Sequence, residues 1–210
     1  MGKTTMRMTF VAIGGAILAL GLAAPAGAQL PPGVYAGERD YHQAPAGTYA
    51  LDPAHTAVVA KVSHIGYSLS VFRFDKVAGT LKWDPDHPEA SALDVQVETA
   101  SIDTPVPNFA KELSGDQYLK SAGFPTATFV STGFHKIDAT HGRVTGQFTL
   151  MGKTRPMTFD VELEGAGKGF MGHPRLGVEA VGRINPEDFG LPALFSTPIE
   201  LVIDAEFSRT

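Results

Sequence analysis

The strongest constraint on this chain is a strict alternation of apolar and polar residues in short segments that begin near residue 48. The segment 155–164 shows it in full, with apolar Met157, Phe159, Val161 and Leu163 alternating with polar Thr158, Asp160, Glu162 and Glu164. Side chains alternate across a β-strand, so each such segment has one buried face and one wet face. Antiparallel sheets leave one face in water, and the apolar face must pack on a second sheet or close on itself. The pattern predicts an all-β protein, either a sandwich or a barrel.

Eight segments have this strand character and are separated by Gly, Pro, Asp and Asn. They are residues 55–65, 70–83, 91–100, 126–135, 142–151, 155–164, 175–184 and 198–207. Many short strands divided by turns are typical of sandwiches and barrels. Residues 108–122 break the pattern, because Asn108 is a candidate cap and Phe109 and Leu113 would share one side of a short helix. We expect this helical excursion to cover one end of the barrel.

The N-terminus has the composition of an export signal. Basic Lys3 and Arg7 precede an apolar run over residues 10–22, and small residues then lead to Ala28. The run is shorter than the roughly 20 apolar residues that span a bilayer, so we interpret it as a signal peptide that is cleaved after Ala28. A Pro-, Gly- and Ala-rich stretch follows, of the kind that forms flexible linkers. The expected organisation is a signal peptide, a linker and one domain, over residues 1–28, 29–46 and 47–210.

Charge and cysteine content exclude several classes of function. The formal net charge is −5, and loss of the two basic residues of the leader makes it more negative. An acidic surface repels nucleic acid and anionic membrane surfaces, so we expect neither to be a direct partner. The chain has no cysteine. Disulfides, thiolate nucleophiles and zinc–cysteine sites are therefore excluded.

Two glycine-containing motifs resemble nucleotide-binding loops but lack the required context. Residues 151–154 (Met-Gly-Lys-Thr) resemble the end of a phosphate-binding loop, yet Gln147 stands where that loop needs Gly and Pro156 blocks the following helix. Residues 165–169 contain three glycines but no βαβ unit surrounds them. Both motifs are better interpreted as turns between strands.

Seven histidines raise the question of a metal site. They are His42, His55, His64, His87, His135, His141 and His173. None forms a His-x-His pair or a helical His-x-x-x-His pair, although ligands can still assemble from distant strands. The chain also has no Gly-x-Ser-x-Gly nucleophile motif. We therefore expect a protein that is not an enzyme and holds no metal.

Seven stretches of the chain, in this order and spacing, resemble the YceI-like family of secreted lipid-binding proteins. They are Tyr49-x-Leu51-Asp52-Pro53-x-His55-Thr56, Val62-Ser63-His64-x-Gly66, Arg73-Phe74-x-x-x-x-Gly79-Thr80-Leu81, Ser101-Ile102-Asp103-Thr104, Tyr118-Leu119-Lys120-x-x-x-Phe124-Pro125-Thr126-Ala127-Thr128-Phe129, Val144-Thr145-Gly146-x-Phe148-Thr149-Leu150-x-Gly152-x-Thr154-x-Pro156-Met157 and Asn185-x-x-Asp188-Phe189-Gly190. The resemblance runs from about Gly47 to Phe207, which is essentially the whole expected domain.

The resemblance implies a lipocalin-like, antiparallel, eight-stranded β-barrel with an elongated apolar cavity. It further implies a periplasmic protein that binds a polyisoprenoid chain, such as an isoprenoid quinone or a polyprenyl lipid, for transport or storage. No cofactor other than this lipid is implied. Members are often homodimers. A neutral quinone ring fits the acidic composition better than a diphosphate headgroup, and the lipid is expected to exchange transiently with a membrane rather than anchor the protein there.

The expected lining of the cavity consists of apolar strand residues on the presumed inner face. These are Val58, Ala60, Val62, Phe72, Phe74, Phe129, Phe148, Phe159, Leu201 and Ile203. Candidates for the mouth, where a headgroup would sit, are His64, Arg73 and Arg143. Two alternatives remain open at this point. The interior could be filled by its own side chains, as in a stress-response or interaction module, or the protein could be an enzyme with a histidine-bound metal.

Overall fold

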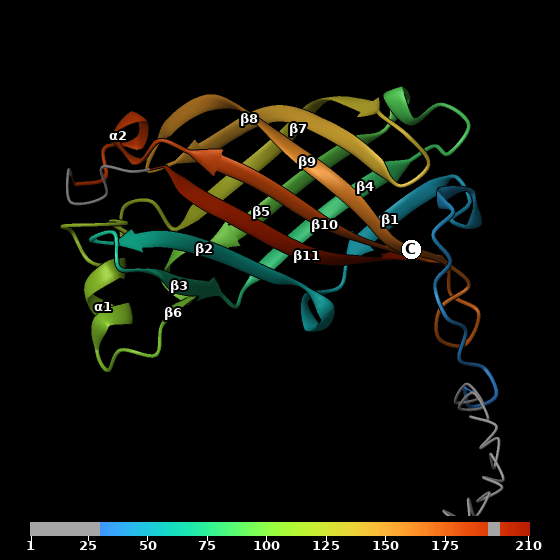
Figure 1. Cartoon of the computed structure of the whole chain (residues 1–210), viewed down its shortest axis with the longest axis horizontal. Coiled ribbons are helices and arrows are strands. Elements are labelled where there is room, and N and C mark those ends of the chain that lie inside the picture. Colours follow the sequence, from blue (N-terminus) through green and yellow to red (C-terminus); the bar gives the residue numbers. More distant parts are fainter. Residues whose placement is uncertain (1–29, 193–197) are drawn as a thin grey trace, which may run out of the picture.

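The computed structural model describes residues 30–192 and 198–210, and these contain eleven strands and only short helices (Figure 1). The strands are β1 (Gly47–Leu51), β2 (Ala57–His64), β3 (Ser68–Phe74), β4 (Val77–Trp83), β5 (Ala92–Glu98), β6 (Ile102–Asp103), β7 (Thr126–Lys136), β8 (His141–Leu150), β9 (Lys153–Gly167), β10 (Arg175–Ile184) and β11 (Ile199–Arg209). The expected signal peptide, residues 1–28, lies outside the described residues. No helix within them combines the length and the hydropathy needed to cross a membrane.

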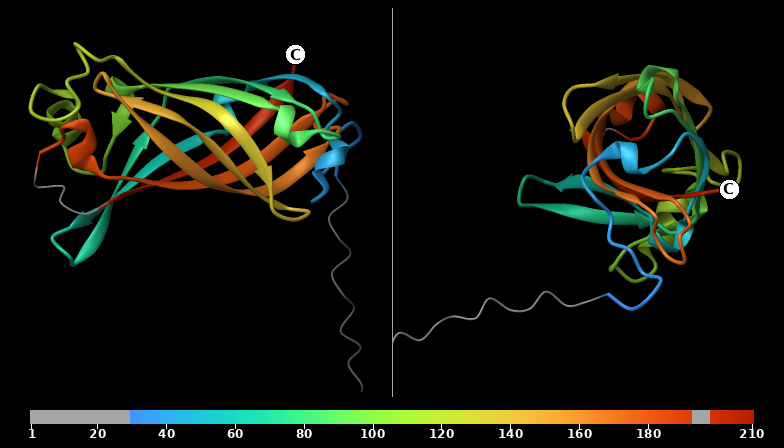
Figure 2. Two further views of the ribbon diagram at one scale, coloured as in Figure 1. Left: turned by 90° about the horizontal axis from the view of Figure 1, so that it is seen from above. Right: turned by 90° about the vertical axis from the view of Figure 1, so that its right-hand side faces the viewer.

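Eight of the strands form a closed antiparallel barrel, which confirms the expected fold. Their order around the barrel is β1, β4, β5, β7, β8, β9, β10 and β11, and β11 pairs again with β1. The ring is visible when the molecule is viewed along its length (Figure 2). The apolar side chains of each alternating segment face the interior, for example the buried Met157, Phe159 and Leu163 of β9.

Strand β11 changes partners along its length, and this creates a second feature of the fold. Its residues Glu200–Asp204 pair with β2, whereas Phe207–Arg209 pair with β1. Strand β2 continues into β3, so the β2–β3 hairpin leaves the barrel wall and projects from one end of the molecule (Figure 2). Beyond this hairpin, β3 pairs only with the two residues of β6 among the described strands.

The segment 70–83, expected to be one strand, forms two strands that pair with different neighbours. Strand β3 pairs with β2, whereas β4 pairs with β1 and β5. The chain turns at Asp75 and Lys76, whose backbone N–H groups donate to the carbonyl and the hydroxyl of Ser101. Neither residue is a glycine or proline, and Asp75 is the one turn-forming residue at this corner. Strands β1 and β6 were not among the eight candidates because they are short.

The helical excursion is confirmed but is shorter than the expected 108–122. Helix α1 (Phe109–Ser114) ends at Gly115, and the Asn108 side chain does not cap it. The Phe109 ring lies 6.1 Å from the ring of Phe72 on β3, and Leu113 is buried. Helix α1 therefore covers the end of the barrel from which the hairpin projects, and α2 (Pro186–Phe189) lies at the same end (Figure 1).

The segment expected to be a flexible linker packs on the opposite end of the barrel. The backbone of Glu38 exchanges two hydrogen bonds with Ala166 on β9, and Tyr41–Gln43 form the 3₁₀-helix η1. Ala44 is completely buried, and its carbonyl accepts a hydrogen bond from the Trp83 indole. The linker prediction was wrong for residues 34–46, because composition does not reveal backbone pairing with a strand distant in the sequence.

Candidate functional site

The barrel encloses an apolar cavity of ≈ 220 Å³. Its wall is formed almost entirely by aliphatic and aromatic side chains from barrel strands and from the start of β2. These include Leu51, Val58, Leu81, Val95, Phe129, Val144, Phe148, Phe159, Leu163, Val178, Leu201, Ile203 and Phe207. This volume exceeds that of an engineered apolar cavity of about 150 Å³, which stays dry and binds benzene. The interior is therefore not filled by the protein's own side chains.

Six of the ten expected lining residues border this cavity. They are Val58, Phe129, Phe148, Phe159, Leu201 and Ile203. Ala60, Val62 and Phe72 are buried but do not line the cavity; they belong to a core cluster that joins Leu113 of α1 to the lining residues Phe129 and Phe159. Phe74 is half-buried and packs on both core clusters without lining the cavity. All four lie on the β2–β3 hairpin, which diverges from the barrel, and there the ring of Phe72 meets Phe109 of α1 rather than the cavity.

Two aromatic rings of the lining lie toward the end of the cavity that is nearer α2. The rings of Phe129 and Phe159 meet edge to face, with centroids 5.1 Å apart. Two glycines make room for them, because a Cβ on Gly146 would lie 2.5 Å from Phe129 Cζ and one on Gly182 would lie 2.9 Å from the Phe159 ring. We call Phe129 and Phe159 the aromatic floor. Beside it, Phe148 packs against Phe189 of α2 at 5.4 Å.

The other end of the cavity is its mouth, where polar residues join the lining. The β7–β8 hairpin contributes His135, Lys136, Asp138, Thr140, His141 and Arg143, and Tyr41 of η1 lies across from them. Lys136 Nζ donates a hydrogen bond to the Tyr41 hydroxyl at 2.6 Å and lies 4.8 Å from the centre of its ring. The Tyr41 ring also meets Trp83 edge to face at 6.0 Å. The N-terminal segment thus lies over the mouth.

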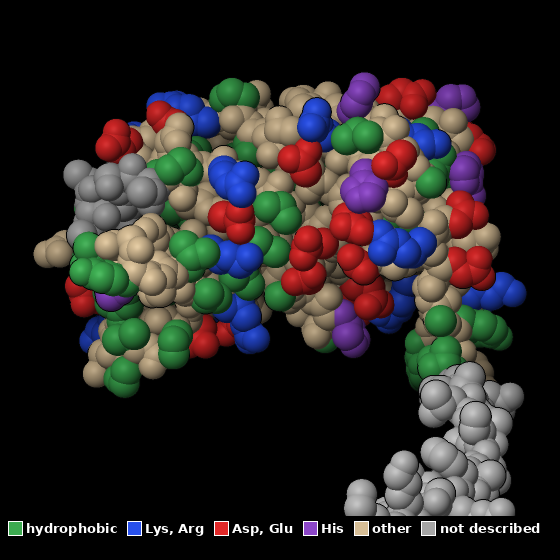
Figure 3. Space-filling model, in the orientation of Figure 1, with side chains coloured by type: hydrophobic (Ala, Val, Ile, Leu, Met, Phe, Trp, Pro, Cys, Tyr) green, Lys and Arg blue, Asp and Glu red, His purple; other side chains and the backbone are tan. Residues whose placement is uncertain are grey.

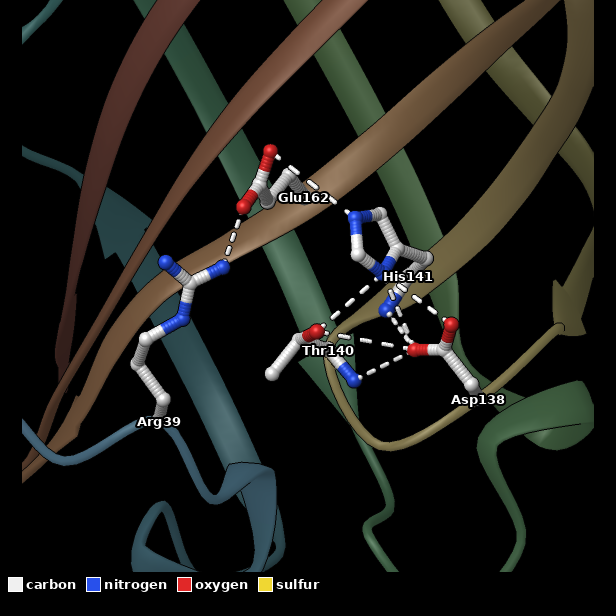
Figure 4. Close-up of polar contacts among 5 residues, drawn as sticks. All are labelled: Arg39, Asp138, Thr140, His141 and Glu162. Atoms are coloured by element: carbon white, nitrogen blue, oxygen red, sulfur yellow. Dashed lines mark hydrogen bonds and ion pairs between the residues drawn. The ribbon is translucent and has the colours of Figure 1, made fainter.

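An ion-pair network holds this segment to the rim (Figure 4). Arg39 pairs with Glu162 on β9 and lowers the pKa of that carboxyl, and Glu162 also lies 3.9 Å from His141 Nε2. His141 in turn contacts Asp138, 3.0 Å away. The pKa of Asp138 is lowered to about 2, mainly by a hydrogen bond from the Thr140 backbone N–H and next by the hydrogen bond with the His141 ring. All these groups are solvent-exposed, so the network positions the rim more than it stabilises the fold.

The three residues expected at the mouth are separated by the structure. Arg143 lines the mouth, and its Nε donates to Asp160 at 2.7 Å. His64 is exposed at the end of β2, on the hairpin that projects from the opposite end of the barrel. Arg73 is exposed at the base of that hairpin and pairs with Asp75 at 2.5 Å. His64 was a candidate because it ends a predicted strand and Arg73 because it is basic, and the sequence assigns neither residue to one end of the barrel.

Sequence reasoning missed Tyr41 and Lys136. Tyr41 falls in the segment interpreted as a linker, and Lys136 ends β7 just beyond the strand limit expected from the alternation. A tyrosine within an otherwise Pro-, Gly- and Ala-rich stretch was the available signal, because a large aromatic side chain gains most from packing.

One cluster of potential metal ligands exists among the described residues, formed by Asp52, His55 and Glu206. Arg175 occupies it, because its Nη1 donates to Asp52 at 3.0 Å and also pairs with Glu206. A guanidinium remains charged in proteins, so it competes directly with a cation for both carboxylates. His55, which most strongly lowers the pKa of Asp52, completes an ion-pair cluster on the outside of the barrel. His64, the histidine expected at the mouth, is not part of it.

A closed antiparallel barrel with an apolar cavity and a covered mouth defines the class of lipocalin-like binding barrels. Residues 49–207 match the model of the YceI-like domain, and the chain belongs to this family. Protein YceI of Salmonella arizonae is 35% identical over 168 residues, which cover 77% of this chain and 86% of the relative.

Solved structures share the fold at lower identity. BcnA of Burkholderia cenocepacia has a TM-score of 0.67 and 20% identity, with 74% of this chain and 98% of that chain covered. A polyisoprenoid binding domain from Saccharophagus degradans has a TM-score of 0.57 and 16% identity, with 77% of this chain and 98% of that chain covered.

Proposed function

We propose that this protein binds an isoprenoid lipid non-covalently inside its barrel. The observation that carries the proposal is the apolar cavity, which has the aromatic floor toward one end and a polar mouth at the other. Transfer of one CH₂ from water to an apolar site is worth about 0.8 kcal/mol, so each isoprene unit gains roughly 3–4 kcal/mol. Among the described residues, the charged side chains that line the cavity belong to the β7–β8 hairpin at its mouth, and the wall below them is apolar.

Family membership and one structural neighbour support this ligand class. The chain belongs to the YceI-like family, and the Saccharophagus degradans domain of the same fold is described as polyisoprenoid-binding. Binding, rather than catalysis, is the activity that an enclosed apolar wall supports best. The filled-barrel alternative does not account for the vacant interior, and the histidine–metal alternative does not account for Arg175 within the Asp52 cluster.

The mouth favours a neutral headgroup, such as the ring of an isoprenoid quinone. Of the Lys and Arg side chains that line the mouth in the described part of the chain, Arg143 is already paired with Asp160 and only Lys136 has no carboxylate partner. A diphosphate needs several free cations or backbone donors. A quinone carbonyl needs one or two donors, which the Lys136 ammonium and the Tyr41 hydroxyl supply.

We further propose that the protein acts in the periplasm as a carrier or store. The alternative environment of an isoprenoid is a bilayer, which is as apolar as the cavity, so transfer from the membrane to the barrel is nearly neutral in free energy. Such a protein exchanges lipid with a membrane without being anchored in it. A homodimer is compatible with this role but nothing in the role requires one.

Extraction of the purified protein with organic solvent, followed by mass spectrometry, tests the proposal. We expect about one isoprenoid lipid per chain, enriched in quinones over polyprenyl phosphates. A matched pair of variants tests the headgroup: Lys136→Met should lose the quinone preference while retaining lipid, and Lys168→Met, outside the cavity, should retain both. Lipid-free protein that takes up no added isoprenoid would contradict the proposal, and a profile of polyprenyl diphosphates alone would contradict its headgroup.

A further inference from the structure

The tip of the β2–β3 hairpin exposes four large apolar side chains at one end of the molecule. Ile65 is 76% exposed, Tyr67 89%, Leu69 58% and Val71 50%. Tyr67, Leu69 and Val71 alternate along the chain, so they share the outward face, whereas Phe72 is buried. The hairpin projects beyond the barrel, and apolar side chains gather at that end of the surface (Figures 2 and 3). Grouped exposed apolar side chains of this kind mark interaction sites.

The turn residue Ile65 shows that this tip is not optimised for folding. The Tyr67 N–H donates to the His64 carbonyl, and both central residues have positive φ, 54° at Ile65 and 78° at Gly66. Turns with positive φ at both central positions favour Asn-Gly or Asp-Gly, and a β-branched residue there is a conformational outlier. An isoleucine at this position is both strained and exposed, so its side chain must serve something other than the stability of the fold.

The tip also carries no acidic, lysine or arginine side chain, in contrast to the rest of the surface, and His64 is its one titratable group of the basic kind. Residues 62–72 contain no Asp, Glu, Lys or Arg, although the chain is 19% charged. Lys61 and Arg73, which flank this stretch, are paired with Glu200 and Asp75. The tip can therefore leave water without desolvating an ionised side chain. An acidic protein approaches an anionic bilayer most easily through its uncharged projection.

We propose that the β2–β3 hairpin tip docks the protein on a lipid bilayer, with Ile65, Tyr67 and Leu69 in the interfacial region. An aromatic residue with a polar tip, such as Tyr67, is typical of this region. A second copy of the chain fits less well. The four exposed side chains offer on the order of 500 Å², against the about 800 Å² per partner that a stable interface buries. The inference rests on the proposed function, because docking would serve lipid exchange. Vesicle binding and bound lipid are nevertheless measured in separate experiments.

Flotation with vesicles of phosphatidylethanolamine and phosphatidylglycerol tests the docking. We expect the wild-type protein to float. The triple variant Ile65→Asn, Tyr67→Ser, Leu69→Ser should bind the vesicles at least about tenfold more weakly, because each lost apolar side chain removes buried area. Ile137→Asn and the pair Phe170→Ser, Met171→Ser, which alter exposed apolar residues elsewhere, should leave binding unchanged. All variants share residues 1–29, so any contribution of that segment cancels.

Because the chain has no cysteine, a single environment-sensitive dye can report which end touches the bilayer. A dye on Tyr67→Cys should shift to shorter wavelength when vesicles are added, and one on Ile137→Cys, at the mouth end, should not. The reverse result, unaltered flotation of the triple variant, or no wild-type flotation would overturn the inference. The inference would also be overturned if light scattering shows a wild-type dimer that the triple variant does not form, and the wild type does not bind vesicles. Vesicle binding by a protein that carries no isoprenoid would contradict the proposed ligand and leave the docking surface intact.

Discussion

Tyr41 and Lys136 meet across the mouth of the cavity, with 2.6 Å between the hydroxyl and the ammonium. Tyr41 comes from the N-terminal segment and Lys136 from the end of β7, so this contact joins two parts of the chain that are far apart in sequence. The ammonium also lies over the tyrosine ring. Together the two interactions hold the N-terminal segment over the opening through which a lipid would pass.

Tyr41→Ala should therefore open the mouth and speed lipid release. The lost hydrogen bond and cation–π contact are together worth about 1.5–2 kcal/mol, which corresponds to roughly 10- to 30-fold faster release. The rate is measured by transfer of a fluorescent isoprenoid from the protein to acceptor vesicles. Tyr35→Ala is the matched control, because its ring also lies under a lysine, Lys168, but does not line the cavity. Equal release rates for both variants would show that Tyr41 does not gate the mouth.

Phe159→Ala should deepen the cavity and lengthen the isoprenoid chain that it accepts. Without lipid, loss of a core phenylalanine should lower the free energy of unfolding by about 3–5 kcal/mol, and a lipid that fills the new space should restore part of it. Urea unfolding with and without lipid, together with mass spectrometry of the bound chains, measures both effects. Leu113→Ala, at a buried residue that does not line the cavity, should destabilise the protein without changing chain length. If Phe159→Ala binds isoprenoids of unchanged length, the aromatic floor does not determine the length of the bound lipid.

The acid sensitivity of the β7–β8 hairpin should depend on Asp138. Its pKa is lowered from 3.8 to about 2 by the Thr140 N–H and by His141, so its ionised form stabilises the fold above its unfolded pKa. This contribution is lost as the pH falls from about 4 to 2. The stability difference between wild type and Asp138→Asn should therefore shrink over this range, as followed by denaturant unfolding. A difference that stays constant down to pH 2 would mean that the carboxylate does not contribute through its charge.

Ile65→Asn should stabilise the protein even though it weakens vesicle binding. The left-handed conformation costs a non-glycine residue roughly 1–2 kcal/mol, and asparagine tolerates it far better than isoleucine. We expect the free energy of unfolding to rise by about 0.5–1 kcal/mol, measured in urea. Ile137→Asn, which replaces an exposed isoleucine without positive φ, should give no such gain. A loss of stability in Ile65→Asn would show that this side chain serves the fold.

Alternation along the strands was enough to predict the class of fold. Each of the eight predicted segments holds at least one strand, and the helical excursion falls between β6 and β7 as expected. Alternation with a period of two is a property of one segment, so it can be recognised without knowing which strands pair with it. The corner at Asp75 and Lys76 was missed for the same reason. Hydrogen bonds to Ser101, not a glycine or proline, set that corner.

Alternation shows which side chains face inward, but only the tertiary structure decides what they face. Val58 and Val62 lie on the same face of β2, yet Val58 borders the cavity and Val62 packs in the core cluster beside α1. The difference arises where β11 exchanges β2 for β1 as its partner, which closes the barrel and directs the hairpin away from it. The sequence by itself determined a set of strands with one apolar face. Whether that face encloses a vacant cavity or a packed core depends on pairings between distant strands, and no local pattern encodes them.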